Sequence, residues 1–129
     1  MILKSFEIDK SNISNFKLFI IYGDNEGLKK EIIHKIKETH VGKEIRYEEE
    51  QVLKNKDAFF SEIKNKSLFE EKKILYVERC SEKISEIILD IEKNCLDDLI
   101  IISCGNLEKK SKLRNFVEKS DFAIIIPTY

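Results

Sequence analysis

Residues 17–30 read KLFIIYGDNEGLKK, an apolar run followed by a glycine-bearing turn and then by a helical pattern. Strand, turn and helix in this order surround a phosphate-binding P-loop, whose pattern is G-x-x-x-x-G-K-[ST]. Gly23 aligns with the first glycine of that pattern, whereas Gly27 falls one position before the second. The stretch therefore predicts the setting of a P-loop with an altered loop.

Three residues at the end of this loop decide whether it can bind a nucleotide. Leu28 stands where the second glycine belongs, Lys29 where the lysine belongs, and Lys30 where a magnesium-binding hydroxyl belongs. A leucine side chain would crowd the phosphates, and a lysine cannot replace an oxygen ligand of magnesium. The sequence predicts a degenerate P-loop with no nucleotide, metal or other cofactor and no intrinsic ATPase. On this interpretation Lys29 is dispensable.

The rest of the chain alternates isoleucine-rich runs with helical patterns. Short apolar runs without alternation, typical of strands covered on both faces, lie at 17–22, 73–78, 99–103 and 123–126, and a more polar strand is expected at 44–48. Apolar residues at helical spacing occur within 28–36, 58–63, 84–91 and 113–117. This rhythm predicts an α/β fold with a parallel sheet of about five strands and right-handed connections.

Composition narrows the function classes. The 129 residues suffice for one domain with a core, and no apolar run approaches the roughly 18 residues of a membrane span. No signal-peptide pattern is visible, so we expect a cytoplasmic protein without a membrane partner. The 23 Lys and Arg residues against 24 Asp and Glu argue against a dedicated nucleic-acid surface. Three cysteines without C-x-x-C spacing support neither a disulfide framework nor a zinc site.

The end of the third expected strand gives a second test of nucleotide chemistry. In P-loop ATPases this position carries acidic residues that hold magnesium and orient the attacking water. Here the strand ILYV is followed by Glu78 and Arg79. Glu78 could hold a metal, but Arg79 cannot act as a base. The strand end therefore agrees with the loop in predicting no hydrolysis.

Four stretches together resemble the N-terminal domain of the delta subunit of bacterial DNA polymerase III, a clamp-loader subunit. They are YGDNEGLKKE at 22–31, SLF at 67–69 followed by ILYV, LIIIS at 99–103, and LEKKSKLRNFVEK at 107–119 leading to AIIIPTY. The resemblance implies an AAA+ type fold with strand order 5-1-4-3-2 and no ATP hydrolysis. It also implies that residues 1–129 are a single AAA+ like domain of a longer chain, whose lid and collar domains contact the other clamp-loader subunits.

The resemblance also assigns a partner. Ser67, Leu68 and Phe69 match the family's clamp-binding tip, which implies a non-catalytic domain that binds and helps to open the sliding clamp, the beta subunit, in DNA replication. Two adjacent large apolar residues at a helix end cannot both face the core, since neighbours point about 100° apart. They could alternatively fasten the helix end to the sheet. Phe59 and Ile63 of the preceding helix are expected to be buried.

Two further questions stay open in the sequence. Lys109, Lys110, Lys112 and Arg114 form a basic cluster. It could contact DNA or a partner, or it could be an ordinary solvated helix face; direct DNA contact is expected to be weak or absent. The alternative function is a divergent P-loop nucleotide-binding enzyme whose loop tolerates the substitutions described above.

Overall fold

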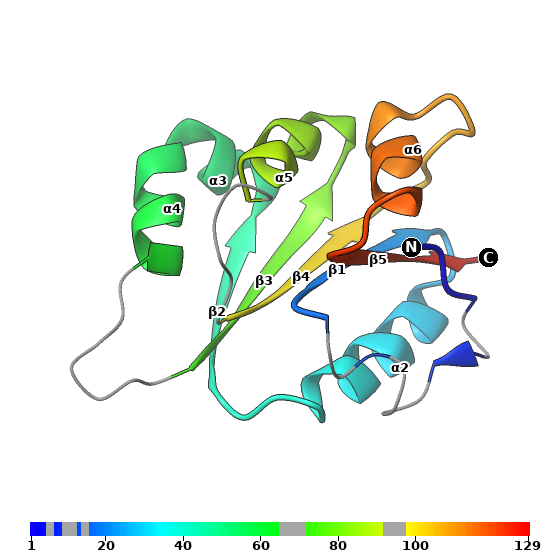
Figure 1. Cartoon of the computed structure of the whole chain (residues 1–129), viewed down its shortest axis with the longest axis horizontal. Coiled ribbons are helices and arrows are strands. Elements are labelled where there is room, and N and C mark those ends of the chain that lie inside the picture. Colours follow the sequence, from blue (N-terminus) through cyan, green and yellow to red (C-terminus); the bar gives the residue numbers. More distant parts are fainter. Residues whose placement is uncertain (5–6, 9–12, 14–15, 65–71, 92–97) are drawn as a thin grey trace.

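The computed structural model describes residues 1–4, 7–8, 13, 16–64, 72–91 and 98–129. These residues build a five-stranded, all-parallel sheet with helices on both faces (Figure 1). The strands are β1 (Leu18–Gly23), β2 (Lys43–Glu48), β3 (Lys73–Cys80), β4 (Leu99–Cys104) and β5 (Ala123–Thr128). The α/β class and the parallel sheet expected from the sequence are confirmed.

The strands lie in the order β2-β3-β4-β1-β5, which reads 5-1-4-3-2 when it is followed from the β5 edge. β1 is therefore inside the sheet, and Ile20 and Ile21 are fully buried. β2 forms one edge, where exposed and half-buried side chains suit a strand in water. At the other edge, Ile2 forms an isolated parallel bridge with Ile125 of β5.

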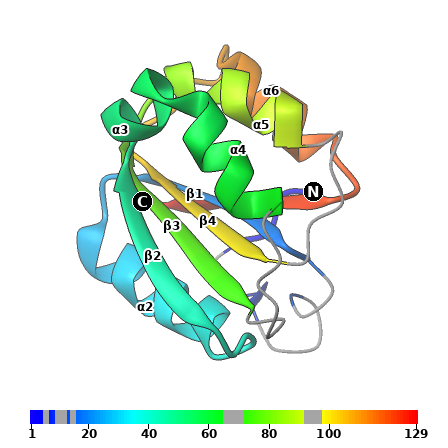
Figure 2. The same ribbon diagram turned by 90° about the vertical axis from the view of Figure 1, so that its left-hand side faces the viewer.

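The helices divide between the two faces of the sheet (Figure 2). α2 (Glu26–Lys37) covers one face. The other is covered by α3 (Glu49–Lys54), α4 (Lys56–Lys64), α5 (Ser85–Ile91) and α6 (Lys112–Glu118). This division follows from handedness: the β1–β2 connection crosses the sheet in one direction and the later connections cross it in the other, so right-handed crossovers lie on opposite faces.

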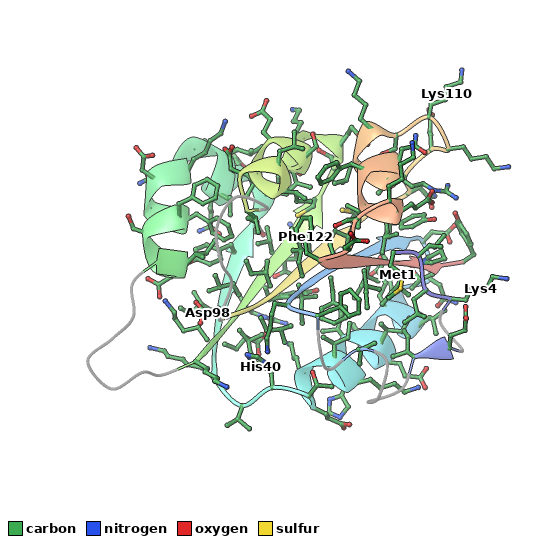
Figure 3. The ribbon with its side chains drawn as sticks, viewed as in Figure 1. Met1, Lys4, His40, Asp98, Lys110 and Phe122 are labelled. Carbon is green, nitrogen blue, oxygen red and sulfur yellow. The ribbon has the colours of Figure 1, made fainter. Side chains whose placement is uncertain are left out.

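Two apolar layers fill the space between sheet and helices (Figure 3). Because successive strand residues point to opposite faces, Leu18, Ile20 and Tyr22 pack under α3–α6. Phe19 and Ile21 pack on the α2 side. A continuous apolar run is therefore required in each inner strand, as the sequence pattern indicated.

The elements differ from the expected ones in three places. α3 was not anticipated; it begins with a capping box in which Glu48 and Gln51 exchange bonds with each other's backbone amides. β3 continues past a bulge to Cys80. β5 continues through Pro127 to Thr128, because an edge strand tolerates a residue without a backbone N–H. Ser81 is the N-cap of the 3-10 turn Glu82–Ile84 that precedes α5.

Candidate functional site

The turn between β1 and α2 is short for a phosphate-binding loop. β1 ends at Gly23 and α2 begins at Glu26, so only Asp24 and Asn25 lie between them. A P-loop places four residues between its glycines and points their amides at the phosphates. Here the side-chain Oδ1 of Asn25 accepts a hydrogen bond from the Leu28 amide at 3.1 Å. A side chain of the turn itself thus caps the helix.

Backbone groups of the turn are also bonded to neighbouring segments. The Gly23 amide donates to the Gly105 carbonyl at 3.2 Å, and the Asn25 amide donates to the Thr128 carbonyl at 3.3 Å. These bonds hold the turn against the residues at the ends of β4 and β5. Both amides are engaged within the protein, in positions where a P-loop would direct such groups at a phosphate.

The two glycines of the loop have different roles. Gly23 has φ +127°, and a Cβ atom there would lie 1.9 Å from the Thr128 carbonyl oxygen. A residue with a side chain therefore cannot occupy position 23 without displacing β5. At Gly27 the nearest atom to an added Cβ is the Asn25 Oδ1 at 3.8 Å. Gly23 is required by the sheet, whereas nothing in the described turn requires glycine at position 27.

Lys29 is directed into the protein. Its side chain is 5% exposed, and Nζ donates to the Cys104 carbonyl at 2.7 Å and to Glu26 Oε1 at 3.2 Å. The residue in the place of the P-loop lysine therefore connects α2 to the end of β4. The sequence predicted that Lys29 is dispensable. From this contact we expect instead that Lys29 stabilises the fold, because removing its ammonium group would leave a buried carbonyl without this donor.

The sequence predicted that the Leu28 side chain crowds the place of the phosphates. In the structure Leu28 is half-buried and packs against the apolar layer on the α2 side. Leu28 shares this stripe with Ile32, four residues on, since residues at this spacing lie on one helix face. The turn is thus closed by its own hydrogen bonds and not by a leucine side chain. Lys30 is exposed, as its position on the opposite face of α2 requires.

A polar pocket of about 340 Å³ lies between α2 and the ends of β3 and β4. Its central side chain is Tyr76, whose ring lies 5.0 Å from Lys37 Nζ and 5.3 Å from the Arg46 guanidinium. Burial raises the pKa of the Tyr76 hydroxyl, and a hydrogen bond with Ser103 opposes this shift. Lys37 also bonds Glu44 at 2.6 Å, which lowers the pKa of that carboxyl group. The cations beside Tyr76 thus already have partners within the protein.

The two residues singled out at the end of the ILYV run, Glu78 and Arg79, differ in exposure. Arg79 has φ +56°, and its exposed guanidinium lies 3.5 Å from Glu48 Oε1. Glu78 is half-buried. Within the described ranges, no group of three or more His, Cys, Asp and Glu side chains could hold a metal ion.

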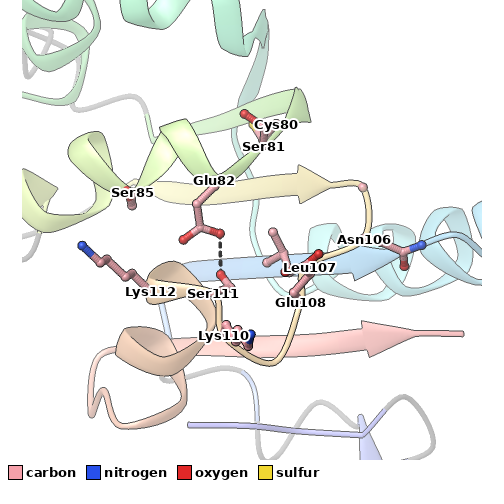
Figure 4. A pocket seen from close by; sticks show the side chains of 11 residues that line it. Cys80, Ser81, Glu82, Ser85, Asn106, Leu107, Glu108, Lys110, Ser111 and Lys112 are labelled. Carbon is pink, nitrogen blue, oxygen red and sulfur yellow. Dashed lines mark hydrogen bonds between the residues drawn. The ribbon is translucent and has the colours of Figure 1, made fainter.

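A second pocket, of about 560 Å³, lies between the end of β3 and the start of α6 (Figure 4). Glu82 projects into this region, where its carboxylate accepts hydrogen bonds from the Ser111 hydroxyl and from the Leu113 amide, the latter at 2.8 Å. Nearby, the carboxylate of buried Glu49 accepts from the Ser81 hydroxyl at 2.8 Å. Sequence analysis missed both glutamates, because their partners lie about 30 residues away. Carboxylates of the protein thus occupy positions at the carboxyl edge, where α/β domains usually bind ligands.

The basic cluster is divided. Lys109, Lys110 and Lys112 are exposed, and Figure 3 shows Lys110 pointing away from the protein. Arg114 is instead paired with Glu118 at 2.9 Å, and its guanidinium lies 5.3 Å from the centre of the Tyr22 ring. Among the four residues of this cluster, which the structure describes, the three lysines are therefore the ones most accessible to a partner.

The predicted clamp-binding residues Ser67, Leu68 and Phe69 lie outside the described residues. Of the two residues expected to be buried before them, Phe59 is 2% exposed, which confirms the prediction. Ile63 is only partly buried, at the edge of the apolar layer. The structure thus describes the residues on either side of this segment, but not Ser67, Leu68 and Phe69 themselves.

Charged groups hold the two ends of that segment close to the sheet. The Lys73 amide donates to Asp98 Oδ1 at 3.1 Å. Its ammonium group lies 3.7 Å from Asp98 Oδ2 and also bonds the backbone carbonyl of Glu62. Asp98 is 6% exposed. The last turn of α4 and the first residue of β3 are therefore joined at the amino edge of the sheet, opposite to the β1–α2 turn.

No known protein family and no curated protein matches the chain. The resemblance to the clamp-loader subunit therefore stays a prediction that depends on the four sequence stretches. Among the described helices, none has the length and apolar character needed to cross a bilayer.

Proposed function

We propose that this chain is a non-catalytic AAA+ type domain of a clamp loader, which binds the bacterial sliding clamp in the cytoplasm and helps to open it for DNA replication. The observation that supports this proposal is the β1–α2 turn. It occupies the place of a nucleotide loop, but Asn25 caps its helix and Lys29 bonds the Cys104 carbonyl. A sheet of this type without a phosphate site suits a domain that acts by binding a partner.

The proposed contact is the segment Ser67-Leu68-Phe69, which follows α4 and precedes β3 in the chain. Among the residues that flank it, Lys73 at the start of β3 bonds the backbone carbonyl of Glu62 in the last turn of α4. Large apolar side chains that enter a pocket and lose their water contribute most of the affinity in many interfaces.

In this proposal binding energy drives the opening of the ring. A ligand shifts a conformational equilibrium only by the difference between its affinities for the two states. The tip must therefore bind an open or strained protomer of the clamp more tightly than a closed one. No ATP hydrolysis by this domain is required for that step.

Clamp binding by Leu68→Ala/Phe69→Ala tests the proposal. Truncating two anchors should cost on the order of 2–4 kcal/mol, or roughly thirty-fold to a thousand-fold in affinity for the clamp of the same organism. Leu89→Ala is a matched control, because Leu89 is a half-exposed leucine of α5 that lies outside the matched stretch 67–69. Unchanged clamp affinity, or loss of the fold in place of binding, would show that these residues belong to the core and that the proposal is wrong.

The alternative enzyme function makes the opposite prediction for nucleotides. Titration calorimetry with MgATP should give no binding heat, since the Gly23 and Asn25 amides and the Lys29 ammonium group already have protein partners. Micromolar MgATP binding, or hydrolysis by the purified chain, would favour the divergent P-loop enzyme.

A further inference from the structure

Two cysteines end neighbouring strands side by side. Cys80 is the last residue of β3 and Cys104 the last residue of β4, and they are partners in the parallel register of the two strands. Both are free thiols, 4% and 1% exposed, in the apolar layer under α3–α6. Adjacent strands lie about 4.8 Å apart, and disulfides join residues whose Cα atoms are roughly 4.4–6.8 Å apart. The backbone therefore holds the pair within range of a bond.

A bulge in β3 produces this pairing. Val77 is opposite Ile102 and Cys80 is opposite Cys104, so β3 has one more residue than β4 over this interval. Arg79, at φ +56°, occupies the left-handed conformation that residues with side chains rarely adopt. In a regular strand position 79 would be opposite Cys104. The bulge that contains Arg79 thus places the Cys80 thiol, and not the Arg79 side chain, opposite Cys104.

We infer that Cys80 and Cys104 are a redox-sensitive pair, which closes to an intramolecular disulfide on reaction with a hydroperoxide. The thiolate of one cysteine attacks a peroxide oxygen and breaks the O–O bond, giving a sulfenic acid and, after proton transfer, water or an alcohol. The second thiol then attacks that sulfur, and the hydroxyl group leaves as water. Two thiols lose two electrons and two protons, and one hydroperoxide accepts them.

Access to the pair comes from the pocket in Figure 4, which Cys80 lines. Its volume of about 560 Å³ admits a small oxidant. A hydrogen bond with Cys104, together with burial, raises the pKa of the Cys80 thiol. Because the thiolate is the reacting form, the pair should react slowly at neutral pH and faster in alkaline solution. It should stay reduced where thiol-reducing systems operate.

Thiol titration of the oxidised chain tests this inference. The Cys95→Ser chain keeps only Cys80 and Cys104 of the three cysteines. After treatment of the folded protein with hydrogen peroxide, denaturation and titration, it should have lost both thiols and regain them with dithiothreitol. It should remain a monomer on a non-reducing gel, and a peptide map should show Cys80 linked to Cys104.

Single-thiol variants are the matched controls. Cys80→Ser or Cys104→Ser in the Cys95→Ser chain lacks the second thiol, so oxidation of the remaining cysteine should stop at the sulfenic acid, which dimedone labels, and no linked peptide should form. Alanine variants are used if serine prevents folding, as judged by circular dichroism. Two free thiols after oxidation of the folded Cys95→Ser chain would overturn the inference. So would equal dimedone labelling of the Cys95→Ser chain and the single-thiol controls, or a wild-type map in which Cys95 replaces either partner.

Discussion

Replacing Lys29 with methionine tests whether its buried ammonium group stabilises the fold. Methionine keeps an unbranched apolar side chain but removes Nζ, which donates to the Cys104 carbonyl at 2.7 Å. A hydrogen bond from a charged group contributes about 1.5–3 kcal/mol, and the ion pair with the exposed Glu26 adds less than about 0.5 kcal/mol. We therefore expect Lys29→Met to lower the free energy of unfolding by about 2–3 kcal/mol.

Thermal and urea unfolding followed by circular dichroism measure this loss. With an unfolding entropy of about 2.1 cal/mol/K per residue, each kcal/mol lowers the Tm of a chain of this length by about 4 °C, so Lys29→Met should melt roughly 7–11 °C below wild type. Lys30→Met is the matched control, because Lys30 is adjacent and exposed; it should stay within about 0.5 kcal/mol. Equal stability of the two variants would refute the structural role assigned to Lys29.

Two further predictions concern the turn and the sheet edge. Gly23→Ala should lower the free energy of unfolding, measured in urea, by more than about 3 kcal/mol, because a Cβ atom there meets a backbone oxygen at 1.9 Å. Gly27→Ala should leave this free energy unchanged or raise it by up to about 1 kcal/mol. Similar losses in both variants would contradict the different roles assigned to the two glycines. Since the hydrogen bond and charge of Lys37 lower the pKa of Glu44 in the folded state, this pair should stabilise the fold above the unfolded pKa of Glu44 and lose that effect as the pH falls through its folded pKa. The effect should be below about 1 kcal/mol for a pair at the surface. It should be smaller in Lys37→Met, where Arg46 still lowers the pKa of Glu44, and unchanged in the exposed control Lys35→Met; the same acid dependence in wild type and Lys37→Met would exclude a contribution of Lys37.

The sheet could be predicted because its signals are local. Runs such as Ile100–Ile102 have no polar alternation, and a strand with this composition must be covered on both faces. α3 escaped prediction because it has only six residues, of which Val52 is the single apolar side chain that is fully buried. With so short an apolar stripe, periodicity gives no helical signal. The capping box of Glu48 and Gln51 was the available indication.

The sequence identifies the altered P-loop positions but not the contacts that their residues make. The sequence shows that a hydroxyl is missing at position 30 and a second glycine at position 28. It does not show that Lys29 reaches the Cys104 carbonyl, since these residues are 75 positions apart and their contact depends on the sheet order. The direction of the Leu28 side chain likewise depends on which face of α2 packs against the sheet. Tertiary packing decides both.

The closed turn limits how the proposed clamp-binding activity could be controlled. In a nucleotide-dependent domain, binding at the carboxyl edge biases the conformation of distant segments, because the nucleotide has different affinities for two states. Here Asn25, Lys29 and Glu82 satisfy polar groups at that edge with bonds inside the domain. Under the proposed function no nucleotide binds in this turn, so none supplies the free-energy difference that releases the clamp. Under the proposed function, control of the tip must instead come from the clamp itself or from neighbouring subunits that contact this domain.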